Sequence, residues 1–230
     1  MNKNILLIGG SHGIGNAIVD ELKESNTIYV ASRTNENLAH PNVHHIPFDA
    51  ETDDLDLASL PEKLHGFVFC LGNINLRPFK MISEEAFLKD IQVNFLNMVK
   101  ILKAVIGRID ENGSIVLFST VAVSTGMPFH TSIAAAKGAI EGFARSLAAE
   151  YAPKIRVNVI APSLVDTSLA EKLLNNDAKK EKMNERHPLK RFGQPKDIGS
   201  VAAFLLSDRT SLITGQVFGV DGGISTLNLN

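Results

Sequence analysis

The stretch ILLIGGSHGIGNAIVDEL, residues 5–22, joins an apolar strand to an amphipathic helix through a glycine-rich turn. Its glycines are spaced Gly-x-x-x-Gly-x-Gly, rather than the Gly-x-Gly-x-x-Gly of the wider dinucleotide fingerprint. Glycines at such a junction permit a tight turn and let a pyrophosphate approach the backbone at the positive end of the helix. A turn that merely connects strand and helix is the alternative. The predicted cofactor loop consists of Gly9, Ser11, His12, Gly13, Ile14 and Gly15.

Short apolar runs alternate with longer helical patterns along the rest of the chain. Several runs are apolar on both faces, which suits parallel strands covered by helices on each side. The predicted strands are residues 4–10, 27–32, 43–48, 66–72, 113–119, 155–162 and 215–223. The predicted helices span about 14–24, 83–107, 131–151, 168–183 and 195–206. The pattern predicts a doubly wound parallel α/β sheet, and since no repeat or linker interrupts it, residues 1–230 are predicted to form a single domain.

The segment between the second and fourth strands departs from this alternation. RTNENLAHPN, residues 33–42, contains Pro41 and three asparagines, so a turn is predicted there in place of a helix. A short helix near residues 53–64 is predicted after the third strand.

Composition narrows the partners and the compartment. The chain is 44% hydrophobic and 21% charged with a formal net charge of −2, so no nucleic acid or anionic membrane partner is expected. Its one cysteine, Cys70, excludes an intrachain disulfide and a thiolate metal cluster, and no metal site is expected. Cys70 lies in an apolar run and is interpreted as a small buried residue. Neither a signal peptide nor a membrane span is predicted, which favours the cytoplasm.

Several motifs together resemble those of the short-chain dehydrogenase/reductase family, over nearly the whole chain. GGSHGIG (9–15) resembles the glycine motif of that family, and RFGQPKDIGSVAAFLLSDRTSLITGQVFGVDGG (191–223) resembles its C-terminal block. The resemblance implies a Rossmann-type oxidoreductase acting on a small-molecule substrate. It also implies that Asp49 lies near the adenine and that Thr167 approaches the cofactor. Gly72 matches only the last glycine of the family's Asn-Asn-Ala-Gly motif, and it is predicted to bind the cofactor. Ser163 stands where the family has a glycine.

The end of the second strand indicates which nicotinamide cofactor is used. An acidic residue there would bind the ribose 2′-hydroxyl of NAD. The strand instead ends in Ser32 followed by Arg33, whose planar guanidinium can pair with a 2′-phosphate. His12 occupies a loop position that is often basic in family members that prefer NADP. NADP(H) is therefore the predicted cofactor, with a surface arginine as the alternative interpretation of Arg33.

The catalytic residues of the family are only partly present. The resemblance assigns the asparagine to Asn94, the serine position to Thr120 and the lysine to Lys137. The position of the tyrosine that protonates the substrate falls on Ile133, in FHTSIAAAKGAI (129–140). The two tyrosines of the chain lie elsewhere in the sequence. The usual proton donor is therefore predicted to be absent.

Three interpretations follow from this substitution. His130 could donate the proton, since it lies seven residues before Lys137, where enoyl reductases of the family place their tyrosine. It could equally be a loop residue at the start of the helix, and a hydroxyl of Thr131 or Ser132, or a bound water, could replace it. Alternatively, an enone or iminium substrate needs little acid catalysis. In the third interpretation the protein binds NADP(H) without turnover, as an accessory or regulatory protein.

Two further segments bear on the substrate and on assembly. Residues 167–187 correspond to the mobile lid of the family, and their leucines could either close over an apolar substrate or pack as a helix. The helix at 131–151 corresponds to one that forms a dimer interface in the family, which implies a homodimer or homotetramer. Its apolar spacing would also fit a buried core helix.

Overall fold

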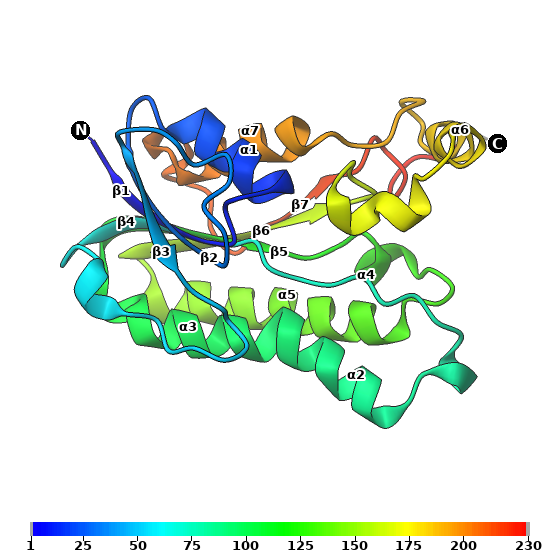
Figure 1. The fold of residues 1–230 in the computed structure, drawn as a ribbon, viewed down its shortest axis with the longest axis horizontal. Coiled ribbons are helices and arrows are strands. Elements are labelled where there is room, and N and C mark those ends of the chain that lie inside the picture. Colours follow the sequence, from blue (N-terminus) through cyan, green and yellow to red (C-terminus); the bar gives the residue numbers. More distant parts are fainter. Residues whose placement is uncertain (1, 229–230) are drawn as a thin grey trace.

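Within residues 2–228, which the computed structural model describes, a sheet of seven parallel strands forms the centre of the molecule (Figure 1). Its order is β3-β2-β1-β4-β5-β6-β7. The strands are β1 (Asn4–Ile8), β2 (Thr27–Ser32), β3 (Val43–Pro47), β4 (Leu64–Phe69), β5 (Ile109–Phe118), β6 (Ile155–Pro162) and β7 (Val217–Val220). The predicted doubly wound parallel sheet is confirmed, and its strand order reverses between β1 and β4.

Helices cover both faces of the sheet (Figure 1). One face carries α1 (Gly13–Leu22) and α7 (Pro195–Leu206), and the other carries α2 (Glu84–Ile91), α3 (Asn97–Val105) and α5 (Thr131–Tyr151). A π-helical turn, Gln92–Leu96, joins α2 to α3. The short α4 (Ala122–Thr125) and α6 (Asp177–Arg186) lie toward one end of the sheet. Among the described residues, no helix combines the length and the apolar character needed to cross a membrane.

The core is divided into two main layers by the alternation of side chains along each strand. In β1, Leu6 and Ile8 belong to the cluster beneath α3 and α5, whereas Ile5 and Leu7 belong to the cluster beneath α1 and α7. All four side chains are at most 1% exposed. The run of apolar residues in this strand is therefore explained by burial on both faces.

Two predicted helices differ from the structure. The helix predicted at residues 53–64 is wrong: only a short 3₁₀ turn, Leu57–Ser59, forms there. Asp56 accepts a hydrogen bond from the Ala58 N–H and starts the turn, and Pro61 follows soon after it. The helix predicted at 168–183 is split into a 3₁₀ segment, Ser168–Leu173, and α6, because Asn176 caps a new helix by accepting from the Lys179 N–H. The turn predicted at residues 33–42 is confirmed.

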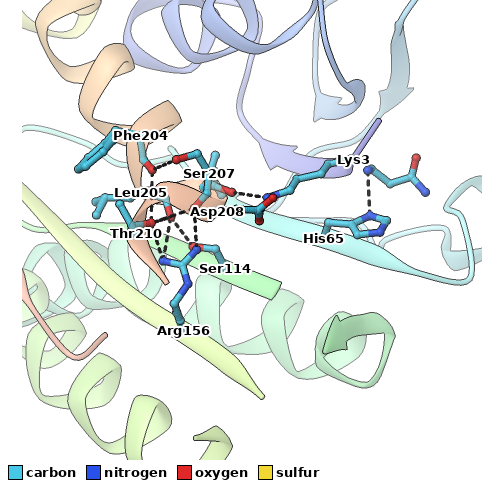
Figure 2. Close-up of polar contacts among 11 residues, drawn as sticks. Lys3, His65, Ser114, Arg156, Phe204, Leu205, Ser207, Asp208 and Thr210 are labelled. Carbon is cyan, nitrogen blue, oxygen red and sulfur yellow. Dashed lines mark hydrogen bonds and ion pairs between the residues drawn. The ribbon is translucent and has the colours of Figure 1, made fainter. Parts of the chain in front are cut away.

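A buried arginine joins the end of α7 to the sheet (Figure 2). Arg156 in β6 donates to the carbonyl oxygens of Leu205 at 3.1 Å and Ser207 at 3.2 Å, and to the Thr210 hydroxyl at 2.8 Å. The Ser114 hydroxyl of β5 also donates to the Leu205 carbonyl, at 2.8 Å. These donors satisfy carbonyl groups that the last turn of a helix leaves without partners.

The loops that follow the strands gather at the carboxyl edge of the sheet. Ile8 of β1 is in register with Ala31 of β2 and Phe69 of β4, so these three strands end at the same level. The glycine turn follows β1, and the loops after β4, β5 and β6 lie beside it in the strand order. In open parallel sheets, ligands bind at this edge, where the strand order reverses.

Candidate active site

The glycine turn forms a cradle that a cofactor pyrophosphate would fit. Gly9 and Gly13 have φ angles of 86° and 54°, in the left-handed region that favours glycine. A Cβ atom at Gly15 would lie 1.9 Å from the Gly9 carbonyl oxygen, so α1 can approach the strand only with glycine there. The N-cap residue of α1, His12, makes no side-chain capping bond, and the first turn carries no acidic residue. This helix N-terminus is therefore suited to an external anion.

A cavity of about 300 Å³ opens beside this turn, where β4, β5 and β6 end. Much of the predicted site is brought together in its lining: Ile14, Gly72, Asn94, Thr120, His130, Ile133, Lys137 and Thr167. The other predicted cofactor residues lie outside its lining: Gly9, Ser11, His12, Gly13, Gly15, Ser32, Arg33 and Asp49. The predicted residues thus divide into a reaction cavity and a cofactor cradle, both at the carboxyl edge.

Lys137 is buried on the cavity side of α5, with 8% of the residue exposed. Its Nζ donates to the Phe118 carbonyl oxygen at 3.1 Å. Burial lowers the pKa of Lys137 to about 8. A Cβ atom at Gly72 would lie 3.5 Å from this Nζ and 2.8 Å from Asn94 Oδ1, so the glycine lets the loop after β4 pack against both side chains. Lys137 can therefore carry or release a proton near neutral pH.

Asn94 is fully buried in the π-helical turn. Its Nδ2 donates to the Asp90 carbonyl oxygen at 2.9 Å and to Asn73 Oδ1 at 2.5 Å. The Asn73 N–H in turn donates to Asn94 Oδ1 at 3.3 Å. π-Helical turns frequently occur at functional sites, and this one holds the asparagine against the loop after β4.

Sequence reasoning missed a buried carboxylate next to Asn94. Asp90 is 1% exposed and accepts hydrogen bonds from Asn73 at 2.7 Å, Asn75 at 3.0 Å and the Ser132 hydroxyl at 2.6 Å. This cluster ties α2, the loop after β4 and the start of α5 together. A signal was present, because Asp90 lies at helical spacing from buried positions such as Asn94 and Met98.

The hydroxyl residues after β5 take different roles. The strand ends at Phe118, and Ser119 and Thr120 after it both line the cavity. Ser119 donates to a Glu141 carboxylate oxygen at 2.6 Å. The Thr120 hydroxyl accepts from the Ala122 N–H at 3.3 Å and retains its own proton for another acceptor.

Ile133 faces this cavity from one helical turn before Lys137 and is 6% exposed. The two tyrosines do not line the cavity: Tyr29 lies in β2 and Tyr151 ends α5. His130 does line it, and its Nδ1 lies 2.7 Å from the Pro128 carbonyl oxygen. Of these side chains, His130 is the one at the cavity that can transfer a proton.

A second histidine at the cavity was not predicted as a site residue. His187 is 2% exposed, and it follows α6 as predicted for the end of the lid. Its Nε2 lies 2.8 Å from the Ser163 hydroxyl and its Nδ1 lies 2.6 Å from the Met183 carbonyl oxygen. The imidazole therefore fastens the end of the lid to the loop after β6. Its position before Pro188 was the available sequence signal.

The lid leucines are divided between the two expected roles. Leu169 and Leu173 line the cavity, whereas Leu174 is buried in a small cluster with Ala170 and Phe192. Met183 of α6 lines the cavity as well. The lid thus has its own packing and also contributes an apolar wall to the cavity.

The predicted cofactor residues outside the cavity lining are either exposed or held by contacts with residues of nearby loops. Arg33 is exposed directly after β2, and the Ser32 hydroxyl donates to the Thr34 carbonyl oxygen at 2.7 Å. His12 lies 2.7 Å from a Glu36 carboxylate oxygen, a contact that the sequence did not predict. Asp49 accepts from the Glu51 N–H at 3.0 Å and so supports the turn after β3.

Cys70 lines the cavity but is a poor nucleophile. Burial raises the pKa of its thiol to about 12, so the thiolate is scarce at neutral pH. Among residues 2–228, no group of three or more His, Cys, Asp or Glu side chains is placed to hold a metal ion.

Comparisons with known proteins agree with this architecture. Residues 9–225 match the family model described as "Enoyl-(Acyl carrier protein) reductase". The chain is 30% identical over 245 residues to human dehydrogenase/reductase SDR family member 4, covering 96% of this chain and 87% of the relative. It is 31% identical over 245 residues to the 3-oxoacyl-(acyl-carrier-protein) reductase FabG of Chlamydia trachomatis, covering 98% of both chains. This chain belongs to the short-chain dehydrogenase/reductase family.

A solved structure from the short-chain dehydrogenase/reductase family has the same fold. The ligand-free aldohexose dehydrogenase of Thermoplasma acidophilum is 27% identical, with a TM-score of 0.89 over 100% of this chain and 96% of that one. Membership in the short-chain dehydrogenase/reductase family assigns a nicotinamide cofactor and oxidoreductase chemistry to the chain. The glycine cradle and the cavity beside it fit such a cofactor.

Proposed function

We propose that this protein is an NADP(H)-dependent oxidoreductase that transfers a hydride to a small, mostly apolar carbonyl, enone or imine substrate, with a proton donor other than tyrosine. The observation that carries the proposal is one cavity, next to a glycine cradle, that is lined by Lys137, Asn94 and Thr120. Its remaining walls are largely apolar, as a small uncharged substrate requires. They include Leu71, Ile74, Phe118, Leu164, Leu169 and Leu173.

The cofactor supplies the hydride, and the side chains of the cavity orient the substrate. Lys137 binds the cofactor ribose, the role implied by family membership, and holds a positive charge beside the cavity. The Thr120 hydroxyl, which accepts from the Ala122 N–H, can donate its own proton to the substrate oxygen. Ile133 packs against the apolar part of the substrate.

His130 is the proposed proton donor. Its Nδ1 contact with the Pro128 carbonyl oxygen fixes the ring, and its Nε2 has no partner among the described residues. As an imidazolium it can give its Nε2 proton to the substrate oxygen as the hydride arrives. A water held by Lys137 and Asn94 is the second possible donor.

An enone or an imine would lessen the need for this acid. In conjugate reduction the negative charge is delocalised away from the carbon that accepts the hydride, and an iminium is already protonated. The match to a family model described as an enoyl reductase supports including enones among the substrates.

The preference for NADP(H) rests on the positive groups at the ribose end of the cradle. Arg33 lies exposed directly after β2, and it can pair with a 2′-phosphate in bidentate fashion. His12 adds a second positive charge when protonated. No carboxylate occupies the last position of β2, which is Ser32.

One observation favours a second candidate function, binding of the cofactor without turnover. Ile133 fills the wall of the cavity where the family has its tyrosine, and it cannot transfer a proton. Under this alternative Lys137 and Asn94 would serve only to bind the ribose and to stabilise the helices.

Two measurements test the proposal. Titration with NADPH followed by fluorescence should show saturable binding, and the absence of binding would contradict both candidate functions. NADPH consumption should then be followed with ketones, conjugated enones and cyclic imines. Turnover of any of these classes supports the oxidoreductase, whereas binding without turnover of any class supports the second candidate.

Variants identify the proton donor in an active enzyme. Lys137→Met should abolish turnover, and Lys103→Met, at an exposed position of α3, is the matched control.

His130→Asn should lower kcat strongly if the histidine is the acid. Full activity of that variant would assign the proton to water instead. Ile133→Tyr should increase ketone reduction if only the acid limits it.

A further inference from the structure

A serine and a histidine meet at one wall of the cavity. Ser163 follows directly after β6, and His187 follows directly after α6. The Ser163 hydroxyl oxygen lies 2.8 Å from His187 Nε2, and both residues line the cavity. Ser163 is partly exposed, whereas His187 is buried. The hydroxyl is thus the part of the pair that a molecule in the cavity can reach.

The second nitrogen of the imidazole decides the direction of this hydrogen bond. Nδ1 of His187 lies 2.6 Å from the Met183 carbonyl oxygen, which can only accept, so Nδ1 of the neutral ring carries the proton. Nε2 is then unprotonated, and it accepts from the Ser163 hydroxyl. A hydroxyl, a base that can take its proton and a third group that orients the base are the components of an activated nucleophile.

The surroundings of the pair provide the other groups that acyl transfer needs. The N–H of Leu164, the residue after the serine, donates to no backbone oxygen within residues 2–228, so it is available to stabilise an oxyanion. The lid contributes Leu169, Leu173 and Met183 to the same cavity, and these side chains suit a short apolar acyl group. A small uncharged ester combines such a group with a carbonyl carbon that the hydroxyl can attack.

We propose that Ser163 and His187 act as nucleophile and base in the hydrolysis of small, mostly apolar carboxylic esters. Ser163 Oγ attacks the carbonyl carbon of the ester while His187 Nε2 takes the hydroxyl proton. The imidazolium gives this proton to the departing alcohol as the ester C–O bond breaks, which leaves an acyl-serine. Water then attacks the acyl carbon and loses a proton to Nε2, and this proton returns to Ser163 Oγ as the carboxylic acid leaves.

This activity goes beyond the proposed oxidoreductase function and does not depend on it. No electrons are transferred in the hydrolysis, and water is its only co-reactant. The family does not account for the hydroxyl either, because Ser163 stands where the family has a glycine. Experiments without any nucleotide can therefore test the pair separately from hydride transfer.

Covalent labelling tests the nucleophile. Wild-type protein is incubated with diisopropyl fluorophosphate, and the modified residue is located by peptide mass spectrometry. The adduct is expected on Ser163, and Ser163→Ala should prevent it. Ser119 is the internal control, since it lines the same cavity but donates to a Glu141 carboxylate oxygen instead of an imidazole. The absence of an adduct, or an adduct on a different residue, would overturn the inference.

Hydrolysis of p-nitrophenyl butanoate tests the base. Both Ser163→Ala and His187→Gln should lower kcat/KM by about a hundredfold or more, as expected when general-base catalysis is lost. Ser211→Ala, in an exposed turn before β7, is the matched control and should leave kcat/KM unchanged. Equal hydrolysis by the wild type and Ser163→Ala would show that the ester is cleaved elsewhere on the protein, which contradicts the proposal.

An introduced thiol separates an activated nucleophile from a purely structural contact. In Ser163→Cys, iodoacetamide should alkylate the new thiol roughly tenfold faster at pH 7 than a free cysteine, because a neighbouring imidazole lowers the pKa of a thiol. Cys70 is the internal control, since it lines the same cavity and burial raises its pKa to about 12. Adding His187→Gln should remove the acceleration. An ordinary rate in Ser163→Cys, with the protein folded by circular dichroism, would refute the activation of this position.

Discussion

At the scale of single residues, Lys137 combines a large energetic cost with a position that chemistry needs. Its ammonium group is buried against the end of β5 with one carbonyl partner, at Phe118. Its low pKa means that the folded state disfavours the charged form, whereas the unfolded chain does not. Such a group is kept for a function rather than for stability.

Replacing Lys137 by methionine should therefore change how stability depends on pH. Below about pH 8 the lysine is charged in both states, and burial of its charge destabilises the folded state of the wild type. Between pH 8 and 10.5 the unfolded state binds more protons, so this cost disappears as the pH rises. The advantage of Lys137→Met in unfolding free energy should fall by about 2 kcal/mol from pH 7 to about 9.5. Urea denaturation of both proteins measures it.

Lys103→Met is the control for this experiment, since its position on α3 is exposed. Titration of other groups is common to all the proteins and cancels in the differences. A constant difference between Lys137→Met and the wild type across this pH range would contradict the assignment of a depressed pKa to Lys137.

Asp90 should behave differently, because its carboxylate is satisfied by several donors. An amide at this position would present a donor to at least one of Asn73, Asn75 and Ser132, which now donate to the carboxylate. Asp90→Asn should lower the unfolding free energy by about 1–3 kcal/mol. Ser132→Ala, which removes one of the donors, should cost about 1 kcal/mol. Urea titrations at pH 7 provide the comparison, and equal stability of wild type and Asp90→Asn would refute the account.

The residues that the sequence could and could not predict differ in how they depend on the fold. Asn94, Lys137 and Gly72 lie in motifs, and the structure gathers them at one cavity. The contact between Asp90 and Ser132 joins residues 42 positions apart. It exists only because α2 packs beside α5, and no local pattern reports that packing. The contact between His12 and Glu36 likewise joins residues that are distant in the sequence, 24 positions apart, and that no local pattern brings together.

At the scale of elements, the lid shows where periodicity alone fails. Leucines at helical spacing predicted one helix, but the first helical segment ends at Leu173. Asn176 then starts α6 as a separate helix through its own capping bond. None of the residues of α6 is buried, so packing of an apolar face does not decide where this helix begins. The capping bond of Asn176 decides it instead. The long regular helix at α5 matches its predicted bounds, Thr131–Tyr151, because its buried face packs along the sheet.

His187 should control the mobility of this lid. Its two ring nitrogens connect the end of α6 to the loop after β6. His187→Ala should increase amide hydrogen exchange in residues 168–186 without changing α5, as measured by mass spectrometry. Ser163→Ala removes only one of the two contacts and should have a smaller effect. Unchanged exchange in the lid would show that its own small cluster, rather than the histidine, holds it.

At the scale of the whole molecule, the doubly wound parallel sheet followed from the sequence, but the assembly of subunits does not. The apolar residues Ile140, Ala144 and Ala148 of α5 face inward and are at most 5% exposed. The interpretation as a core helix is thus confirmed for these residues. The exposed side of α5 carries small residues, among them Gly142, Ser146 and Ala149.

We propose that this outer side of α5 forms a homodimer or homotetramer interface, as family membership implies. Light scattering should give two or four times the chain mass of 24.9 kDa. Ala149→Arg should shift the protein to smaller species, because a long charged side chain prevents close approach of two helices. Ala39→Arg, in an exposed loop after β2, should not. A monomeric wild type at micromolar concentration would contradict the proposal.

The contact between α1 and α7 has a consequence for the protein during its synthesis. A Cβ atom at Gly199 would lie 3.0 Å from the Ala17 backbone, so these helices touch closely although 182 positions separate the two residues, 17 and 199. At roughly 5–20 residues per second, a ribosome needs about 10–40 seconds to make the intervening chain. During that time Ile18 and Leu22 of α1 have no partner helix to cover them. The nascent chain therefore offers an apolar face to chaperones, and a truncated product ending before α7 would be prone to aggregate.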